Sequence, residues 1–197
     1  MKYINQLAHP HILYITRTDP EFADQPYGKT STIKSSGCGL CSAIMVADRL
    51  LPSYDFELSD AIELAYATKA NHGKGTDPKI FFPAFAKKLG LDYKQGKTTE
   101  ELLHCLHTGG AAVVHVGKVE GRVPLFTKGG HYMAVIGQER DGRLAILDPS
   151  YFPGKYDEEG RQGKVEMRQS VISLCTPEIL AEESSMKAIP YHLFWRP

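Results

Sequence analysis

The chain has no excess of charge of either sign, because Lys plus Arg and Asp plus Glu both number 23 among its 197 residues. Proteins that bind nucleic acids or anionic membranes through electrostatics usually carry a basic excess or a long basic segment, and this sequence has neither. We therefore expect no nucleic-acid partner. The apolar content of 42% and charged content of 23% are instead typical of a globular protein.

Long apolar runs are also missing, since no stretch approaches the roughly 20 apolar residues that a membrane-spanning helix requires. The first residues, MKYINQLAHPHILYITRTDP, lack the uninterrupted apolar core and small-residue cleavage site of a secretory signal. We expect no membrane span, and a protein that is either cytoplasmic or secreted after removal of a signal. The sequence does not choose between these compartments, and it gives no oligomeric state.

Cysteine is scarce, with four residues at positions 38, 41, 105 and 175. Four are too few for a disulfide scaffold, and a core of this size does not need one. Cys105 and Cys175 lie in apolar, helical-looking contexts and are predicted to be buried thiols. None of the eight histidines forms a pair with the usual spacing of a zinc site, since only two residues separate His104 from His107. No metal and no cofactor are therefore expected.

The length predicts a single domain over residues 1–197. Apolar residues at helical spacing, together with capping residues and helix-breaking glycines, predict four helices, over about 39–51, 58–70, 78–89 and 98–108. β-Branched and apolar runs then predict strands at 111–116, 132–137 and 144–147. A further helix is expected between about 165 and 185, with a break at Pro177, and an edge strand within 191–197.

Helices therefore precede strands, without the alternation of strand and helix that builds a parallel sheet. The order predicts an α+β fold, with a mainly helical part at about 1–110 packed as a layer on a mainly antiparallel β-sheet part at about 111–197.

Cys38 is the candidate nucleophile. It lies between Gly37 and Gly39 at the start of the first long helix, where the helix dipole and unpaired backbone N–H groups favour thiolate over thiol. The same N–H groups can stabilise an oxyanion, and the glycines leave the sulfur accessible. Other interpretations are a buried structural thiol, a redox pair with Cys41 in a C-x-x-C arrangement, and a zinc ligand.

His131 is the candidate base, because it follows two glycines at the start of a predicted strand. A hairpin turn is predicted at Asp141-Gly142, and counting back from this turn brings His131 beside Asp148 at the end of the partner strand. We expect the Asp148 carboxylate to accept a hydrogen bond from the imidazole Nδ1–H. The other histidines are expected to be solvated or structural, including His115 in the middle of a strand.

Several motifs resemble one known group of enzymes. Pro26-Tyr27-Gly28, Thr32-Ile33, Ser35-Ser36-Gly37-Cys38-Gly39, Ala43 and Met45-Val46 are similar to the start of papain-like cysteine peptidases of the bacteriocin-leader-processing, double-glycine peptidase-like group. Gly130-His131 and Asp148-Pro149 resemble the His and Asp blocks of the same group. The resemblance covers residues 14–50 and 129–149.

The resemblance implies a bacterial thiol protease with a papain-like fold, a Cys38-His131-Asp148 triad and a peptide or protein substrate. Cys38 would attack the peptide carbonyl, His131 would protonate the leaving amine, and water would hydrolyse the thioester. The cleft walls, which would select the substrate, are expected at Asn71–Thr76 and Tyr151–Lys155.

The sequence departs from the pattern of the group at two places. Leu40-Cys41 replaces a Pro-Thr pair, and Arg17 stands where the group often has an oxyanion-hole glutamine in a Gln-x-Asp-x-x-Trp run. Arg17 and Gln25 are the candidate oxyanion donors, although a guanidinium differs from an amide in charge and reach. Alternative functions are acyl transfer or amide hydrolysis at the same triad, peptide binding without catalysis, and thiol oxidoreduction by Cys38 and Cys41.

Overall fold

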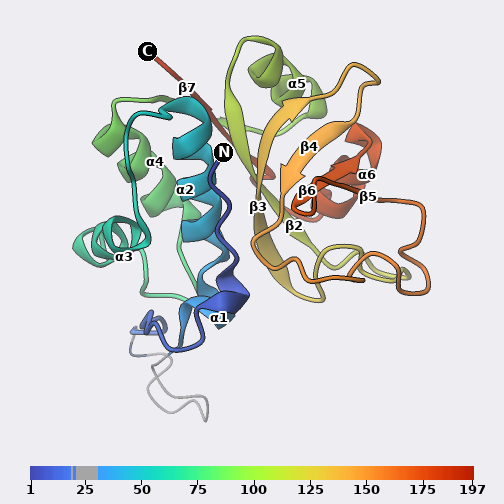
Figure 1. The fold of residues 1–197 in the computed structure, drawn as a ribbon. Coiled ribbons are helices and arrows are strands. Elements are labelled where there is room, and N and C mark those ends of the chain that lie inside the picture. Colours follow the sequence, from blue (N-terminus) through green and yellow to red (C-terminus); the bar gives the residue numbers. More distant parts are fainter. Residues whose placement is uncertain (19, 21–30) are drawn as a thin grey trace.

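A computed structural model describes residues 1–18, 20 and 31–197, which form a seven-stranded antiparallel sheet with helices on both faces (Figure 1). The helices are a 3-10 turn at Gln6–Ala8, α1 (Ile33–Ser36), α2 (Cys38–Leu50), α3 (Leu58–Ala67), α4 (Pro78–Leu89), α5 (Thr99–His107) and α6 (Pro177–Ser184). The strands are β1 (Asp92–Gly96), β2 (Ala111–Gly117), β3 (Gly130–Gln138), β4 (Leu144–Leu147), β5 (Glu166–Arg168), β6 (Ile172–Cys175) and β7 (Tyr191–Trp195). Their order in the sheet is β1-β7-β2-β3-β4-β6-β5.

Helix α2 is the central helix of the molecule and is apolar on nearly all sides. Its residues from Gly39 to Ala47 are buried, because α2 packs on β2 and β3 with one side and on α3 and α4 with others. A helix that is apolar all round is expected in such a buried place. The helix begins after Gly37, where an added Cβ would lie 2.6 Å from the Ile33 carbonyl oxygen, so only glycine lets α1 and α2 meet this closely.

Side chains that alternate between the two faces of the sheet divide the hydrophobic core into two clusters, one on each face. On one face of the sheet, Val113 and Ala134 pack with the buried residues of α2, α3 and α4, whereas Val114 and Met133 on the other face pack with those of α5 and α6. Successive side chains of a strand point to opposite faces, so a single run such as AAVVHV serves both cores.

The predicted hairpin around Asp141-Gly142 is formed by β3 and β4, with Ala134 paired to Leu147 and Val135 to Ile146 and a register shift between Val135 and Gly137. Gly142 has φ 88°, which is the left-handed conformation that a glycine adopts without strain. The hairpin brings the residues before Ala134 and after Leu147 to the same end of the sheet.

The predicted α+β class is confirmed, and the four N-terminal helices and the strands at 111–116, 132–137 and 144–147 lie close to their expected positions. The helix expected between about 165 and 185 is present only from Pro177 onward, and the prediction is wrong for the residues before it. This segment forms β5, β6 and the short helix α6, with Gln169 and Ser170 at positive φ in the turn between the two strands. The apolar pattern of this segment is compatible with a helix, but pairing of β6 with β4 in the sheet overrides it.

The C-terminal strand is also not where it was expected. β7 pairs with β2 on one side and with β1 on the other, so it lies inside the sheet rather than at an edge. β1 is a strand that the sequence does not predict. β1 has the polar sequence DYKQG, which carries little strand signal because most of this edge strand is exposed. Within the described residues, no helix is long and apolar enough to cross a membrane.

Truncation of Phe85 tests the packing of α4 on the sheet. The Phe85 ring is fully buried, with ring centroids 5.4 Å from those of both Phe56 and Phe194. We expect Phe85→Ala to lower the free energy of unfolding by about 3–5 kcal/mol, measured by urea denaturation. Ile80→Ala on the same helix is the control: this residue is 41% exposed, so a change below about 0.5 kcal/mol is expected. Equal losses in both variants would contradict this packing.

Candidate active site

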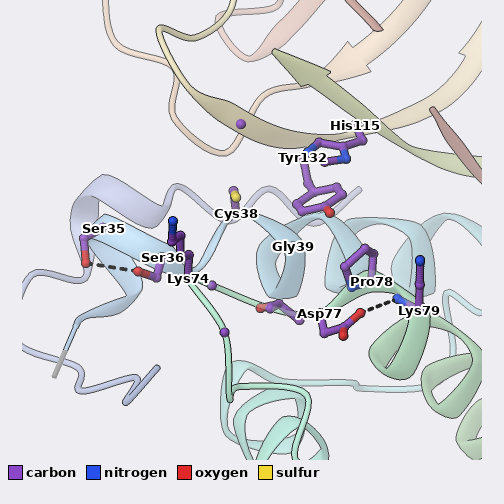
Figure 2. Close-up of a pocket in the computed structure, with 14 residues that line it drawn as sticks. Ser35, Ser36, Cys38, Gly39, Lys74, Asp77, Pro78, Lys79, His115 and Tyr132 are labelled. Carbon is purple, nitrogen blue, oxygen red and sulfur yellow. Dashed lines mark hydrogen bonds between the residues drawn. The ribbon is translucent and has the colours of Figure 1, made fainter. Parts of the chain in front are cut away.

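Cys38 is the first residue of α2 and lines a cavity of about 540 Å³. Figure 2 shows its sulfur directed from the start of the helix toward the sheet that carries Tyr132 and His115. The side chain is half-buried, so the sulfur faces the cavity without being freely solvated. Cys38 is thus accessible to a ligand that enters the cavity.

The pKa of Cys38 lies below its ordinary value of 9.0. Burial alone would raise the pKa, but a hydrogen bond and the positive charge of His131 outweigh it, and the backbone N–H groups of Tyr132 and Gly39 lower it further. One of these N–H groups belongs to the first turn of α2, where backbone donors have no partner within the helix. The surroundings therefore stabilise the thiolate.

His131 is buried at the start of β3, and its Nε2 lies 2.8 Å from Oδ1 of Asp148. Burial would lower the pKa of the imidazole, but the charge and hydrogen bond of Asp148, together with Cys38, raise it to about 9. The contact uses Nε2 rather than the Nδ1 expected from the sequence, and the Ser150 hydroxyl also lies 3.1 Å from this nitrogen. This arrangement leaves Nδ1 as the nitrogen for Cys38.

Asp148 is fully buried directly after β4 and accepts hydrogen bonds from five groups. Oδ1 accepts from His131 and from both the backbone N–H (2.8 Å) and the hydroxyl (3.0 Å) of Ser150. Oδ2 accepts from the Lys155 ammonium at 2.5 Å and the Tyr156 hydroxyl at 2.6 Å. Burial would raise the pKa of Asp148, but His131 and Lys155 hold it well below its usual range, so the group is a carboxylate.

The cavity is bounded by three parts of the chain, the 73–79 segment, the α1–α2 junction and strands β2 and β3. Its lining residues are Ser35, Ser36, Cys38, Gly39, Gly73, Lys74, Gly75, Thr76, Asp77, Pro78, Lys79, His115, Gly130 and Tyr132. Thr76 and Tyr132 approach Gly39 beside the nucleophile, since a Cβ added at Gly39 would lie 3.5 Å from both side chains.

His115 and Tyr132 form the wall that the sheet contributes. Their rings are stacked with centroids 4.3 Å apart, and Figure 2 shows Tyr132 beside Cys38, with His115 behind it toward the sheet. Burial, Lys187 and His131 lower the pKa of His115 to about 4, so this second imidazole is neutral at physiological pH. Of the two loops expected as cleft walls, the stretch 73–76 lines the cavity, whereas Lys155 of the other loop turns inward onto Asp148.

Of the two candidate oxyanion donors, the structure describes Arg17 but not Gln25. Arg17 is described, and its backbone N–H donates to the Gly73 carbonyl at 2.6 Å, which places the residue beside the segment that lines the cavity. Its φ of 61° is unusual for a residue other than glycine. Gln25 lies outside the described residues, as does Pro26-Tyr27-Gly28 of the sequence resemblance.

The remaining cysteines lie in the core. All four cysteines are free thiols, and Cys41, Cys105 and Cys175 are buried. Burial raises the pKa of Cys41 well above its ordinary value, and the neighbouring Cys38 raises it further, so this thiol is a poor partner for redox chemistry. Cys175 ends β6 rather than lying in a helix. Among the described residues, no group of three His, Cys, Asp or Glu side chains is arranged to hold a metal ion.

The side chains that hold Asp148 in place are not evident from the sequence. Ser150, Lys155 and Tyr156 follow Asp148 within eight residues, in a polar, glycine-containing stretch that was interpreted only as a loop. Nothing in that stretch shows which of its residues turn inward. The one usable signal was proximity to a candidate catalytic carboxylate.

The fold is that of papain-like peptidases. The peptidase domain of Streptococcus ComA, described as a bi-functional ABC transporter involved in a quorum-sensing pathway, superimposes with a TM-score of 0.50 at 19% identity, over 81% of this chain and 91% of that domain. A C39-like peptidase from Bacillus anthracis superimposes with a TM-score of 0.52 at 13% identity, over 82% of this chain and 88% of that one.

These solved structures agree with the group that the motifs resemble, the double-glycine peptidase-like enzymes. At these identities the likeness establishes the fold. No profile of a known protein family matches the chain, and no curated protein matches it either.

The lowered pKa of Cys38 predicts a thiol that reacts at neutral pH. Cys38 should be alkylated by iodoacetamide at pH 7, and His131→Ala should slow this reaction about tenfold or more, because it removes the hydrogen bond and charge that lower the Cys38 pKa. Rates measured between pH 5 and 10 by mass spectrometry test this. His104→Ala, at an exposed position of α5, is the control and should match the unsubstituted protein. A Cys38 that labels no faster than Cys105 would refute the activated thiolate.

Proposed function

We propose that the protein is a cysteine peptidase that hydrolyses peptide bonds, with Cys38 as nucleophile, His131 as general acid and base, and Asp148 as the carboxylate that orients His131. The observation that carries the proposal is the chain of contacts from the Cys38 thiol through His131 to the buried Asp148, at the wall of a cavity of about 540 Å³. A lowered cysteine pKa beside a raised histidine pKa is the condition for a thiolate–imidazolium pair.

In the proposed reaction the Cys38 thiolate forms a C–S bond to the peptide carbonyl carbon, and the carbonyl oxygen takes the negative charge. The imidazolium of His131 then gives its proton to the leaving amine as the C–N bond breaks, which leaves a thioester. Neutral His131 next takes a proton from water, whose oxygen attacks the thioester. Departure of the sulfur regenerates the thiolate–imidazolium pair and releases the carboxylic acid product.

The oxyanion needs hydrogen-bond donors, and we infer two sources. The backbone N–H of Cys38 belongs to the first turn of α2, where N–H groups have no acceptor within the helix and the helix dipole is positive. The second is the Arg17 guanidinium in place of the amide that the related peptidases often use. Its backbone contact with Gly73, which itself lines the cavity, supports this assignment.

We further propose that residues 1–197 form one peptidase domain of papain-like plan, in which a helical layer at about 1–110 carries the nucleophile and packs on a sheet part at about 111–197 that carries His131 and Asp148. Packing of α2 on β2 and β3 supports this division. The N-terminal segment also contacts the sheet part, because the Tyr3 hydroxyl donates to the Asp148 carbonyl at 2.7 Å and the Gln6 N–H donates to the Pro149 carbonyl at 2.7 Å.

Hydrolysis is tested with a peptide library of randomised sequence, with products identified by mass spectrometry. We expect cleavage by the unsubstituted chain and none by Cys38→Ala. Cys41→Ala is the matched control, because Cys41 lies one helical turn away in the core, and it should keep the activity. Formation of a Cys38–Cys41 disulfide on mild oxidation would instead favour the redox interpretation. Products that carry added hydroxylamine would indicate acyl transfer, and binding of peptides without products would indicate a binding module.

The role of Arg17 has its own test. We expect Arg17→Ala to reduce kcat about 10- to 100-fold with little change in KM, because an oxyanion donor acts mainly in the transition state. Arg17→Gln, which supplies the amide donor used by the related peptidases, should retain more activity than Arg17→Ala. An unchanged kcat in Arg17→Ala would leave the backbone N–H groups as the only donors.

A further inference from the structure

The Asp148 carboxylate contacts a second cation besides His131. The ammonium of Lys155 lies 2.5 Å from Oδ2, on the opposite oxygen from the one that His131 contacts, and it also donates to the Ser150 hydroxyl at 2.8 Å. Lys155 is only 4% exposed, which is rare for a lysine and requires a compensating negative charge. The histidine and the lysine therefore share one buried carboxylate.

The loop that carries Lys155 is held firmly in the protein. The Arg161 guanidinium, itself buried, donates to the Lys155 carbonyl at 3.0 Å and to the Pro124 carbonyl at 2.8 Å. Tyr156, next to Lys155, donates its hydroxyl to the same carboxylate oxygen at 2.6 Å. These contacts come from different parts of the loop and fix the position of the Lys155 ammonium relative to Asp148.

We propose that Lys155 is a positioning residue for the active site, whose buried ammonium holds Asp148 on His131 and limits how tightly His131 retains its proton. This inference rests on the proposed function, in which His131 must both accept and release a proton. Two physical effects carry it. The ammonium keeps the buried carboxylate ionised, and it offsets part of the negative charge that would otherwise act on the imidazolium alone.

The balance matters because a general acid works best when its pKa lies near the working pH. A buried carboxylate with no other cation would hold the imidazolium proton more tightly and so slow its transfer to the leaving amine. Lys155 keeps the orienting carboxylate in the site while reducing this effect. The second oxygen of Asp148 is thereby used to tune the proton affinity of His131.

Other titratable groups also lie near His131 and Asp148 and affect the pKa values of these two residues. His131 faces Cys38 of α2 and His115 of β2, and the pKa of His115 responds in turn to Lys187. Asp148 faces Tyr3 from the N-terminal segment, in addition to Lys155 and Tyr156. Substitution of Lys155 alone leaves all of these groups present, so a change in His131 reports the loss of one cation.

The pKa of His131 can be measured directly by NMR titration of the imidazole, with the signal assigned by its loss in His131→Ala. We expect Lys155→Met to raise the His131 pKa by about one unit. Lys155→Arg keeps the charge and should stay near the unsubstituted value. Lys164→Met is the matched control, because the Lys164 ammonium lies in the same loop and donates to the Gly160 carbonyl instead. An unchanged His131 pKa in folded Lys155→Met would overturn the proposal.

If Lys155→Met does not fold, Lys155→Gln keeps a polar donor without the charge and should give the same upward shift; no shift would again overturn the role. The pH dependence of Cys38 alkylation gives a second readout without substrate, and its alkaline limb should move upward with the His131 pKa. A shift in a protein that cleaves no peptide would leave the role of Lys155 intact and defeat the proposed function. Peptide cleavage combined with an unshifted pH profile in Lys155→Met would support the proposed function and overturn the role of Lys155.

Discussion

The site depends on a single fully buried carboxylate, that of Asp148. A buried charge without partners would be very costly, so its five hydrogen-bond donors are a condition for the fold as well as for the chemistry. The carboxylate raises the pKa of His131, and His131 in turn lowers that of Cys38. Cys38 on α2, His131 on β3 and Asp148 after β4 are thus electrostatically coupled. The pKa of the Cys38 thiol therefore depends on the sheet as well as on its own helix.

Much of this arrangement could be predicted from local patterns. The glycines on either side of Cys38 and the apolar run after it predict the start of α2, and the Asp141-Gly142 turn predicts a hairpin whose strands bring His131 near Asp148. Both are short-range features, in which a turn or a helix start is encoded by adjacent residues. The α+β class followed from the same periodicities, since they change from helical to extended after residue 110.

The features that could not be predicted depend on contacts between distant segments. β1 and β7 pair although about 100 residues separate Asp92 from Trp195, and nothing in the polar sequence of β1 indicates a partner. The segment of β5 and β6 has an apolar pattern compatible with either helix or strand, and only its neighbour β4 decides between them. The same holds for the choice of His131 nitrogen and for Lys155, whose burial depends on the path of the whole loop.

The contact between Tyr3 and the Asp148 carbonyl joins residues 145 positions apart, so the two ends of the site come from opposite parts of the chain. Contacts of such long sequence separation form late in folding, because the entropy of closing the intervening chain is lost before they can stabilise it. During synthesis, Cys38 emerges from the ribosome long before His131, Asp148 and Lys155. A growing chain therefore carries an ordinary thiol, and the reactive one arises only when the sheet has closed around the carboxylate.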